Sequence, residues 1–489
     1  MKIAISRCGQ SLTQAVTLPK PYSWDLRCAG RGTCGRCRIT LLAGRYLVAG
    51  KELCVTAPTS ALACQTTLLS AEGLIDVPAS AMCVPNGQIH ALWDGPPLLK
   101  RDECVVAVDL GTTTVAAVKI RNGEVLASAS CYNQQSRFGD NVISRISQAA
   151  TPATLAAMQQ AAVTSINDLL AELAADDAQR LAIAGNTVMT TLLWGIDPAP
   201  IGVMPFTPPL RVFPQRRADE LGIALPGATP VMALPAIAGY VGGDLTAGIH
   251  ECQLAPFEML IDIGTNCEIV LRTNDGLFCT AAAAGPAFEG AAIPSGSRAV
   301  AGAIDHVQPD WSYSVIGGGA PNGLCGSAMV DVLYAGRHAG WLNACGRLQA
   351  DVLGKRYRRD GNLQLVAIAP GVALSEADIE QLLKAKAAVY AGIQSLLEYC
   401  HCPVEQLQRI ILAGGFARYL DLDHAVAIAM LPRAKTHIAG NTSLAGAARL
   451  AVNPNIMDEL LAIIAEPKDV PLNMIDGFEN NYIDALFLP

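Results

Sequence analysis

An imperfect internal repeat constrains this chain more than any other feature of its sequence. The segment CVVAVDLGTTTVAAVKI at 104–120 reads as an apolar strand, a Gly-Thr turn and a second strand. EMLIDIGTNCEIVLR at 258–272 repeats that order of elements. The repeat predicts two similar halves with a cleft between them.

The two copies continue alike along the chain. Each is followed by a long helical pattern, at 151–173 and at 375–400, and then by a strand ending in Ala-Gly, at 180–186 and 409–415. Ser375 is a suitable N-cap for the second helix. The segment between the Asp-x-Gly-Thr turn and the Ala-Gly is about twice as long in the second copy as in the first. This difference predicts an insertion near 275–374 in the second copy.

The repeated turns carry residue types that bind phosphate groups. Glycine lets the backbone approach phosphate oxygens, hydroxyl and amide groups donate hydrogen bonds to them, and a carboxylate binds Mg²⁺ directly or through water. A single Asp-x-Gly-Thr is often an ordinary hairpin, whereas two copies with a distal Gly-Gly predict a clamp for ATP and Mg²⁺. We expect Asp109 and Asp262 to be catalytic. The expected nucleotide-binding residues are Gly111, Thr112, Thr113, Thr114, Gly264, Thr265, Asn266, Gly414 and Gly415.

Cysteines form one tight group near the N-terminus. CAGRGTCGRC places Cys28, Cys34 and Cys37 in a Cys-x5-Cys-x2-Cys spacing, close to that of plant-type 2Fe-2S ferredoxins. The fourth thiolate is Cys64 or Cys54, and we favour Cys64, which lies in ALACQT. Structural zinc is the alternative, although such sites usually contain two Cys-x2-Cys pairs.

Charge is distributed unevenly along the chain. Residues 1–80 hold 9 Lys and Arg against 4 Asp and Glu, whereas the remaining residues hold 26 against 39. A basic segment can bind nucleic acid, but no aromatic residues interleave with these charges, so we predict no nucleic-acid partner and favour a docking face for an acidic protein.

Neither a leader nor a membrane span is evident. The first residues contain no apolar segment with a cleavage site, and the most apolar stretch, 181–196, is short and interrupted by polar residues. We therefore expect a cytoplasmic protein with no membrane partner.

Several strings in the chain resemble a known family. The Gly-rich loop through Cys37, followed by LACQT, resembles the N-terminal domain of the reductive activators of corrinoid proteins, and the paired hairpins resemble the acetate and sugar kinase, heat-shock chaperone and actin superfamily. Further strings that resemble the corrinoid activators, in the same order, are AGNTVMTTLLWG, GYVGGDLTAG, AAAAGPAFEGAAI, GLCGSAMVDVL, AGNTSLAGA and YIDALFLP. The resemblance covers nearly the whole chain.

This resemblance implies an α/β plus α+β fold in four parts. An N-terminal β-grasp 2Fe-2S ferredoxin domain at 1–78 and a linker at 79–103 precede a duplicated ribonuclease-H-like ATPase of the actin and sugar-kinase type. Its halves span 104–255 and 256–489.

The resemblance also implies an activity. The 2Fe-2S cluster, bound by Cys28, Cys34, Cys37 and Cys64, would pass one electron to inactive cob(II)alamin on a corrinoid protein, with ATP driving the regeneration of cob(I)alamin. The implied partners are that corrinoid protein and an upstream electron donor, and the implied assembly is a homodimer.

Two other functions agree with the residues. One is a small-molecule kinase with a regulatory ferredoxin domain, and the other is a non-catalytic electron carrier. The chain also departs from the family pattern, because Asn141 stands where the family has Asp, and Asp140 is a possible substitute. Glu289 in GPAFEGA is a further candidate acid, whereas Cys267 reads as a packed strand residue.

Overall fold

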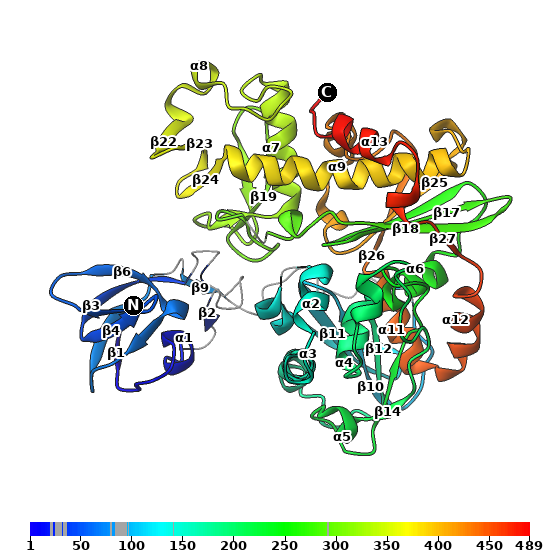
Figure 1. Ribbon diagram of the computed structural model, residues 1–489, viewed down its shortest axis with the longest axis horizontal. Coiled ribbons are helices and arrows are strands. Elements are labelled where there is room, and N and C mark those ends of the chain that lie inside the picture. The colour runs from blue at the N-terminus through cyan, green and yellow to red at the C-terminus, as the bar shows by residue number, and fades with distance from the viewer. Residues whose placement is uncertain are drawn as a thin grey trace.

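Figure 1 shows a small N-terminal module beside two larger bodies, each built around one sheet. The computed structural model describes residues 1–19, 23–24, 32, 37–78, 81–83, 95, 97–139, 141–290 and 293–489. Across these ranges, no helix combines the length and the apolar content that a lipid bilayer requires.

The N-terminal module consists of short strands around a small core. One sheet has the order β1 (Lys2–Ile5), β8 (Gly73–Asp76), β3 (Arg38–Ala43) and β6 (Thr59–Leu62), with antiparallel neighbours. The remaining elements are the sheet β5 (Lys51–Cys54), β4 (Arg45–Val48) and β7 (Thr66–Leu68), the pair β2 (Ser23–Trp24) and β9 (Met82–Cys83), and helix α1 (Leu12–Ala15). Leu41, Tyr46 and Ile75 are fully buried because alternate residues of a strand face the same side. β3 lies in the string RITLLAG, and β8 lies in GLIDVP.

The first large body is a six-stranded sheet covered by helices. Its strands, in spatial order, are β12 (Glu124–Tyr132), β11 (Thr114–Arg121), β10 (Cys104–Leu110), β13 (Leu181–Gly185), β15 (Pro230–Ala233) and β14 (Arg216–Arg217). Its helices are α2 (Val142–Gln148), α3 (Pro152–Glu172), α4 (Thr187–Leu193), α5 (Ala218–Leu221) and α6 (Gly243–Cys252). β10 is antiparallel to β11 and parallel to β13, and it is buried because nearly all of its residues are apolar, as a central strand requires.

The second large body contains a sheet of the same kind. Its strands, in spatial order, are β26 (Thr436–Gly440), β25 (Arg409–Ala413), β16 (Glu258–Ile263), β17 (Cys267–Thr273), β18 (Gly276–Ala282) and β27 (Lys468–Asp469). β16 is antiparallel to β17 and parallel to β25, as β10 is to β11 and β13. In each sheet the strand that carries Asp109 or Asp262 is therefore central, and its carboxyl end faces the other body.

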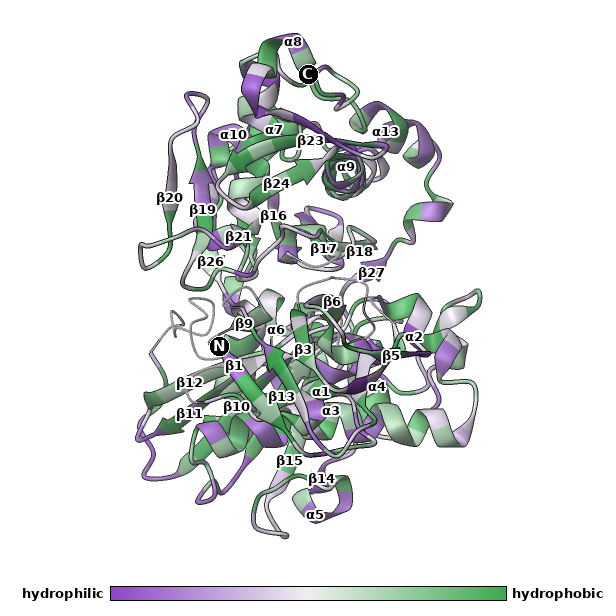
Figure 2. Cartoon of the chain, turned by 90° about the vertical axis from the view of Figure 1, so that its left-hand side faces the viewer, coloured by the Kyte–Doolittle hydropathy of each residue, from purple (hydrophilic) through white to green (hydrophobic). Residues whose placement is uncertain are grey.

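Additional elements separate β18 from the long helix of the second body. They are β19 (Ala303–Val307), β20 (Tyr313–Val315), β21 (Gly323–Leu324), α7 (Gly326–His338), α8 (Ala350–Leu353), β22 (Tyr357–Asp360), β23 (Leu363–Ala369) and β24 (Val372–Ser375). They begin after Ala282 rather than near residue 275, because Gly276–Ala282 is a strand paired with β17. Figure 2 shows β19 and β20 at one edge of the second body, on the side above β12 and β11.

The two expected long helices are confirmed. They are α3 and α9 (Glu376–Tyr399), the yellow helix that spans the upper body in Figure 1. Ser375 caps α9 as predicted, since its side chain accepts a hydrogen bond of 3.1 Å from the backbone N–H of Asp378.

The C-terminal segment returns from the second body to the first. After β26 the chain forms α11 (Thr442–Val452), which packs against β10, β13 and α6. α12 (Met457–Ile463) follows and also packs against α6. Both are orange helices in the lower body of Figure 1. A Cβ added at Gly446 would lie 2.4 Å from the Cβ of Ala247, so small residues allow α11 and α6 to approach closely. The last helix, α13 (Phe478–Ala485), lies along α9.

Candidate active site

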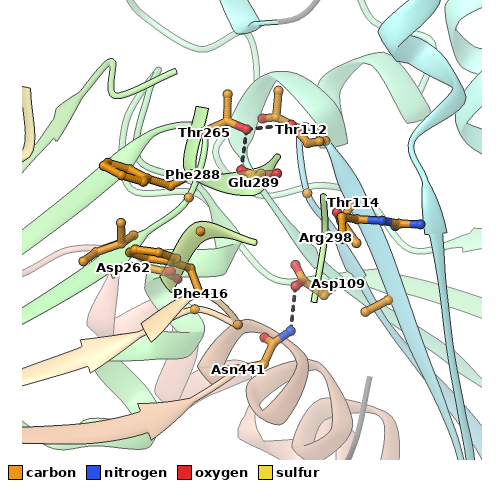
Figure 3. Close-up of a pocket in the computed structure, with 18 of the residues that line it drawn as sticks. Asp109, Thr112, Thr114, Asp262, Thr265, Phe288, Glu289, Arg298, Phe416 and Asn441 are labelled. Atoms are coloured by element: carbon orange, nitrogen blue, oxygen red, sulfur yellow. Dashed lines mark hydrogen bonds between the residues drawn. The ribbon is translucent and has the colours of Figure 1, made fainter. Parts of the chain in front are cut away.

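A single cleft between the two large bodies contains every predicted residue of the paired hairpins and of the distal Gly-Gly. These residues are Asp109, Gly111, Thr112, Thr113, Thr114, Asp262, Gly264, Thr265, Asn266, Gly414 and Gly415. They meet because each hairpin leaves the carboxyl end of a central strand, β10 or β16, and these two ends face each other across the cleft. Figure 3 shows Asp109, Thr112 and Thr114 of one body facing Asp262 and Thr265 of the other.

The two hairpin turns are in direct contact. The hydroxyl oxygens of Thr113 and Thr265 lie 2.7 Å apart, and Thr265 also donates a hydrogen bond of 2.6 Å to Glu289 Oε1. Gly111 is required for the first turn, because a Cβ at this position would lie 2.6 Å from the carbonyl oxygen of Thr114. The candidate acid Glu289 therefore lies in the cleft, where burial raises its pKa.

Asp109 is held by side chains from the C-terminal segment. Asn441 Nδ2 donates to one carboxylate oxygen at 2.9 Å, and Ser443 Oγ donates to the other at 2.7 Å. Burial raises the pKa of Asp109, and these two hydrogen bonds oppose that rise because they favour the charged form. The carboxylate therefore has a defined orientation.

Asp262 has a different environment. Within the described part of the chain it receives no hydrogen bond, and burial, together with the nearby carboxylates of Asp244, Asp109 and Glu289, raises its pKa to about 8. Gly414 lies against it with a φ of 90°, and a Cβ there would be 2.6 Å from Asp262 Oδ1. Only glycine combines this conformation with this close approach.

Two phenylalanine rings form an apolar wall of the cleft. Phe288 and Phe416 are stacked with 5.3 Å between ring centroids and an interplanar angle of 22°. Gly326, at the start of α7, leaves room for this pair, since a Cβ there would lie 2.6 Å from a ring carbon of Phe416. A flat aromatic base has a suitable contact surface here, beside Gly414 and Gly415.

The sequence prediction missed several residues of the cleft. They are Ser130, Asn186, Asp244, Glu268, Phe288, Arg298, Phe416, Tyr419, Asn441 and Ser443. Burial raises the pKa of Asp244 to about 7. Asp244 lies in GYVGGDLTAG and Asn441 in AGNTSLAGA, so both strings were already distinctive in the sequence, but neither contains a recognised phosphate-binding spacing.

Two described cysteines of the N-terminal module, Cys37 and Cys64, lie close together. Cys37 is buried and immediately precedes β3, and Cys64 lies in the turn after β6. The backbone N–H of Ala63 donates to the carbonyl oxygen of Cys37 at 2.8 Å, which places Cys64 beside Cys37. Cys28 and Cys34 lie outside the described residues.

The other candidate for the fourth thiolate is farther away. Cys54 is exposed and pairs with Arg45 at one end of β4. Thr66, two residues after Cys64, pairs with Val48 at the other end of β4. A Cβ at Gly32, within the cysteine loop, would lie 2.8 Å from the side chain of Gln65. Gly32 therefore lies against the turn that holds Cys64.

Two family models match adjoining parts of the chain. The C-terminal domain of RACo, the ASKHA domain, matches residues 256–489, and the RACo middle region matches residues 104–256. The chain belongs to the RACo family. Its larger part thus has the actin and sugar-kinase type of fold that the sequence predicted.

Two relatives of this RACo-family chain have names that refer to corrinoids. The chain is 29% identical over 358 residues to the corrinoid activation enzyme RamQ of Eubacterium limosum, and the match covers 67% of this chain and 60% of that protein. It is 26% identical over 339 residues to the [Co(II) methylated amine-specific corrinoid protein] reductase of Methanosarcina barkeri, with 63% and 62% covered. The matched regions thus span less than two thirds of either relative.

A solved structure covers the RACo-family chain almost completely. The reductive activator for corrinoid, iron-sulfur protein shares 26% identity, and the comparison covers 98% of this chain and 94% of that one with a TM-score of 0.76. The likeness includes the N-terminal module.

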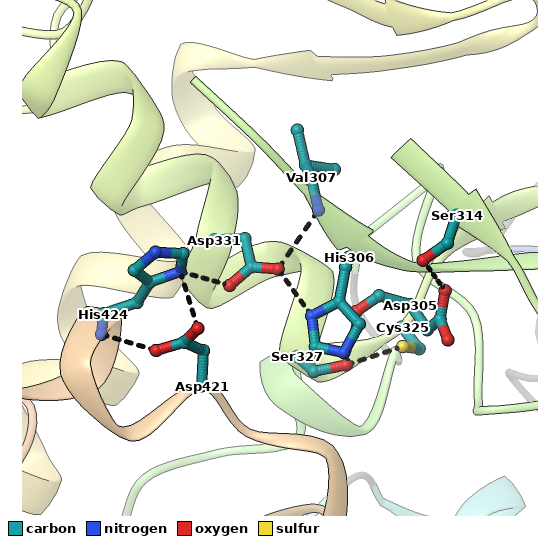
Figure 4. Close-up of polar contacts among 9 residues, drawn as sticks. All are labelled: Asp305, His306, Val307, Ser314, Cys325, Ser327, Asp331, Asp421 and His424. Carbon is teal, nitrogen blue, oxygen red and sulfur yellow. Dashed lines mark hydrogen bonds and ion pairs between the residues drawn. The ribbon is translucent and has the colours of Figure 1, made fainter. Parts of the chain in front are cut away.

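A buried carboxylate lies behind the cleft in this RACo-family chain. Asp331 of α7 is fully buried and accepts hydrogen bonds from the Val307 backbone at 3.1 Å, His306 Nδ1 at 3.0 Å and His424 Nδ1 at 2.7 Å (Figure 4). The bond to Asp331 raises the pKa of His306. Asp331 thereby ties α7 to β19 and to α10 (Leu422–Ala427), and the segments before α7 and α10 line the cleft.

The position where the chain departs from the family pattern has a structural role. Asn141 is the N-cap of α2 and accepts a hydrogen bond of 2.8 Å from the Ser144 backbone. Asp140 lies outside the described residues. Cys267 is fully buried in β17, as its position in an apolar strand predicted.

Proposed function

We propose that this chain couples ATP hydrolysis to the one-electron reduction of inactive cob(II)alamin on a corrinoid protein, which regenerates cob(I)alamin for methyl transfer. The observation that carries the proposal is the contact between two carboxylate-bearing hairpins in one cleft, in a chain whose relatives are a corrinoid activation enzyme and a Co(II) corrinoid protein reductase.

In this proposal the large bodies are a duplicated ribonuclease-H-like ATPase, with halves at 104–255 and 256–489. The backbone and hydroxyl groups of the two turns bind the phosphates of ATP, and the wall formed by Phe288 and Phe416 contacts the base. Asp109 and Asp262 would hold Mg²⁺, directly or through water, and the ion would neutralise phosphate charge.

The N-terminal module, residues 1–78, is proposed to be a β-grasp ferredoxin domain. Cys28, Cys34, Cys37 and Cys64 would hold a 2Fe-2S cluster, which supplies a one-electron carrier. The adjacent positions of Cys37 and Cys64 support this ligand set. Residues 79–103 would be the linker that lets the module approach a partner.

ATP is needed because the electron transfer is uphill. Each ~60 mV of unfavourable one-electron potential costs about 1.4 kcal/mol. Binding or hydrolysis of ATP can supply this free energy only by changing the affinity of the protein for different partner states. Closure of the two halves about the cleft is the conformational change that this proposal assigns to that task.

The partners in this proposal are a corrinoid protein and an upstream electron donor, and the assembly is a homodimer. The basic N-terminal module would dock on an acidic surface of a protein partner.

The decisive experiment measures ATP hydrolysis and cobalamin reduction together. Purified protein with an intact cluster and a reduced donor should hydrolyse ATP faster when a corrinoid protein is present, and should produce the cob(I)alamin absorption spectrum only with ATP. Equal hydrolysis with and without any corrinoid protein, and no cob(I)alamin, would falsify the proposal. Transfer of phosphate to a small molecule would instead identify a kinase.

The ligand set has its own test with a matched control. Cys64→Ser should abolish the 2Fe-2S absorption and electron paramagnetic resonance spectra, whereas Cys54→Ser should leave them nearly unchanged. The reverse result would identify Cys54 as the ligand, and zinc in place of iron in elemental analysis would rule out the cluster.

A further inference from the structure

One basic side chain lies in a cleft that is otherwise acidic. Among the described residues that line it, Arg298 is the only Lys or Arg, whereas the carboxylates are Asp109, Asp244, Asp262, Glu268 and Glu289. A nucleotide brings further negative charge into this space. Arg298 is therefore the one described side chain of the cleft that can offer a permanent positive charge to phosphate oxygens.

Arg298 reaches across the cleft from one half to the other. It belongs to the segment between β18 and β19 in the second half, and its guanidinium carbon lies 3.7 Å from the centre of the Tyr132 ring. Tyr132 is the last residue of β12 in the first half and pairs with Thr114, the first residue after the phosphate-binding turn. Figure 3 shows Arg298 beside Thr114, on the opposite side of the cleft from Phe288 and Phe416.

The base of the Arg298 side chain is firmly positioned. The backbone N–H of Ser297 donates to the carbonyl oxygen of Leu324 at 2.6 Å, and that of Leu324 donates to Ser295 at 2.8 Å. A Cβ at Gly290 would lie 2.4 Å from the Ser297 backbone, so the loop is folded tightly on itself. The loop is thus joined to β21, which directly precedes α7.

The Tyr132 contact holds the guanidinium by its flat face. The negative face of an aromatic ring attracts a guanidinium, and the N–H donors of the guanidinium lie in its own plane, where they can reach phosphate oxygens. The contact exists only when the two halves are close together, because its two members belong to different halves. The presence of Arg298 at the phosphate end of the cleft is therefore linked to closure.

We propose that Arg298 is a catalytic residue that binds the transferring phosphoryl group from the second half when the cleft closes, and that Tyr132 positions it. This inference rests on the proposed ATPase function. In the reaction, water attacks the γ-phosphorus, the bond from that phosphorus to the β–γ bridging oxygen breaks, and its electron pair leaves with ADP. The proton of the attacking water ends in solvent. Arg298 donates hydrogen bonds to the oxygens on which negative charge develops.

The test compares variants in both catalysis and binding. Arg298→Ala should lower kcat for ATP hydrolysis by at least about 100-fold, since arginines in this role contribute on the order of 10³–10⁵ in kcat. Its affinity for ADP should stay within about 3-fold, but the extra affinity for ADP with aluminium fluoride, which mimics the transferring group, should be lost. Arg298→Lys should recover part of the rate, and added guanidinium should raise the rate of Arg298→Ala.

Matched variants separate this role from a general effect of lost charge. Arg216→Ala, which removes an exposed arginine on β14, should leave hydrolysis unchanged. Tyr132→Leu should lower kcat more than Tyr132→Phe, which keeps the ring. Calorimetry of ADP binding and thermal melting establish that each variant is folded.

The outcomes distinguish this inference from the proposed function. If the wild-type protein binds ADP and hydrolyses ATP, but Arg298→Ala binds ADP with aluminium fluoride as tightly as the wild type does, Arg298 is not catalytic and the ATPase function stands. An equal loss of affinity for ADP and for its aluminium fluoride complex would likewise overturn the catalytic role. If the wild-type protein binds no nucleotide, the ATPase function and this inference both fail.

Discussion

The two Asp-Gly-Thr hairpins share a sequence pattern and a position in their sheets, yet their carboxylates differ. Asp109 is fixed by hydrogen bonds from Asn441 and Ser443, whereas Asp262 receives none from the described residues and lies against Gly414. The difference arises because the C-terminal segment crosses from the second half to the first, and no described segment makes the reciprocal contact to Asp262.

This comparison assigns different tasks to two residues that the repeat makes look equivalent. A carboxylate that accepts two strong hydrogen bonds is oriented and remains charged more easily. A buried carboxylate without such bonds, whose pKa rises to about 8, exchanges a proton near neutral pH. We therefore expect Asp262 to take part in the chemistry more directly and Asp109 to act mainly as an oriented acceptor.

The largest expected effect is on catalysis by Asp262→Asn. Loss of this carboxylate should lower kcat for ATP hydrolysis by roughly 10²–10⁴-fold, the range typical for a proton-transfer group, while the protein stays folded because the site is already poor in hydrogen bonds. Steady-state hydrolysis measured with the corrinoid partner checks this. Activity within about 5-fold of the wild-type value would show that the difference between the two carboxylates has no catalytic meaning.

A smaller effect is expected from Gly414→Ala, which forces a methyl group towards Asp262. The positive φ by itself costs about 1–3 kcal/mol for a non-glycine residue, and the close contact with Asp262 Oδ1 should add a loss of nucleotide affinity of at least about 10-fold. Gly371→Ala is the matched control, because Gly371 has a φ of 77° with no atom within 4 Å of an added Cβ. Thermal melting should show destabilisation in both variants, and calorimetry should show weaker ADP binding only in Gly414→Ala.

A still smaller effect should follow when Asp109 is made more like Asp262. Ser443→Ala removes one of its two hydrogen bonds, and a hydrogen bond to a charged group contributes about 1.5–3 kcal/mol. Mg-ATP affinity should therefore fall about 10-fold, with kcat nearly unchanged. If kcat falls as far as in Asp262→Asn while affinity is kept, Asp109 has the more direct chemical task and the assignment is inverted.

The smallest effect concerns stability as a function of pH. The pKa of Asp262 rises from an ordinary value of 3.8 to about 8 in the folded protein, so the native state holds a proton that the unfolded state loses. Its contribution to stability is fully present below about pH 4 and is lost as pH rises towards 8. Asp244, with a pKa raised to about 7, contributes with the same sign.

Asp262→Asn should consequently make the stability of the nucleotide-free protein depend less on pH. Relative to the wild type, its Tm should increase by roughly 10 °C more at pH 8 than at pH 5, since one proton changes stability by about 1.4 kcal/mol per pH unit and 1 kcal/mol shifts the Tm of a domain of 150–250 residues by about 2–4 °C. Differential scanning calorimetry at both pH values measures the difference. Parallel Tm curves for the two proteins would mean that Asp262 is ionised in the folded state.

The local elements of this fold were accessible from the sequence because short-range rules govern them. The helices at 152–172 and 376–399 follow from their apolar periodicity, and the N-cap at Ser375 follows from its side chain and its position. The sequence predicts an insertion that begins near residue 275, whereas Gly276–Ala282 is still a strand of the repeated sheet. Only its pairing with β17 identifies this segment as a strand of the repeated sheet.

The candidate site was only partly accessible. Its glycines and threonines could be located because each hairpin contains them within a few residues. Arg298, Asp244 and the stacked phenylalanines contribute to the cleft from separate segments, and no local pattern joins them. The choice of Cys64 over Cys54 rests on the string around Cys64 and stays a prediction, whereas the pairing of β3 with β6, which sets Cys64 beside Cys37, is visible only in the structure.

The sequence by itself determined that the chain has two hairpins with a carboxylate and a Gly-Thr turn, and a separate cysteine-rich module before them. It did so because these features depend on residues that are neighbours along the chain. Only the tertiary structure decided that the two carboxylates are unequal, since the hydrogen bonds that distinguish Asp109 join residues 332 and 334 positions apart. Contacts over such separations arise from the packing of α11 on the first sheet, and packing is a property of the whole fold.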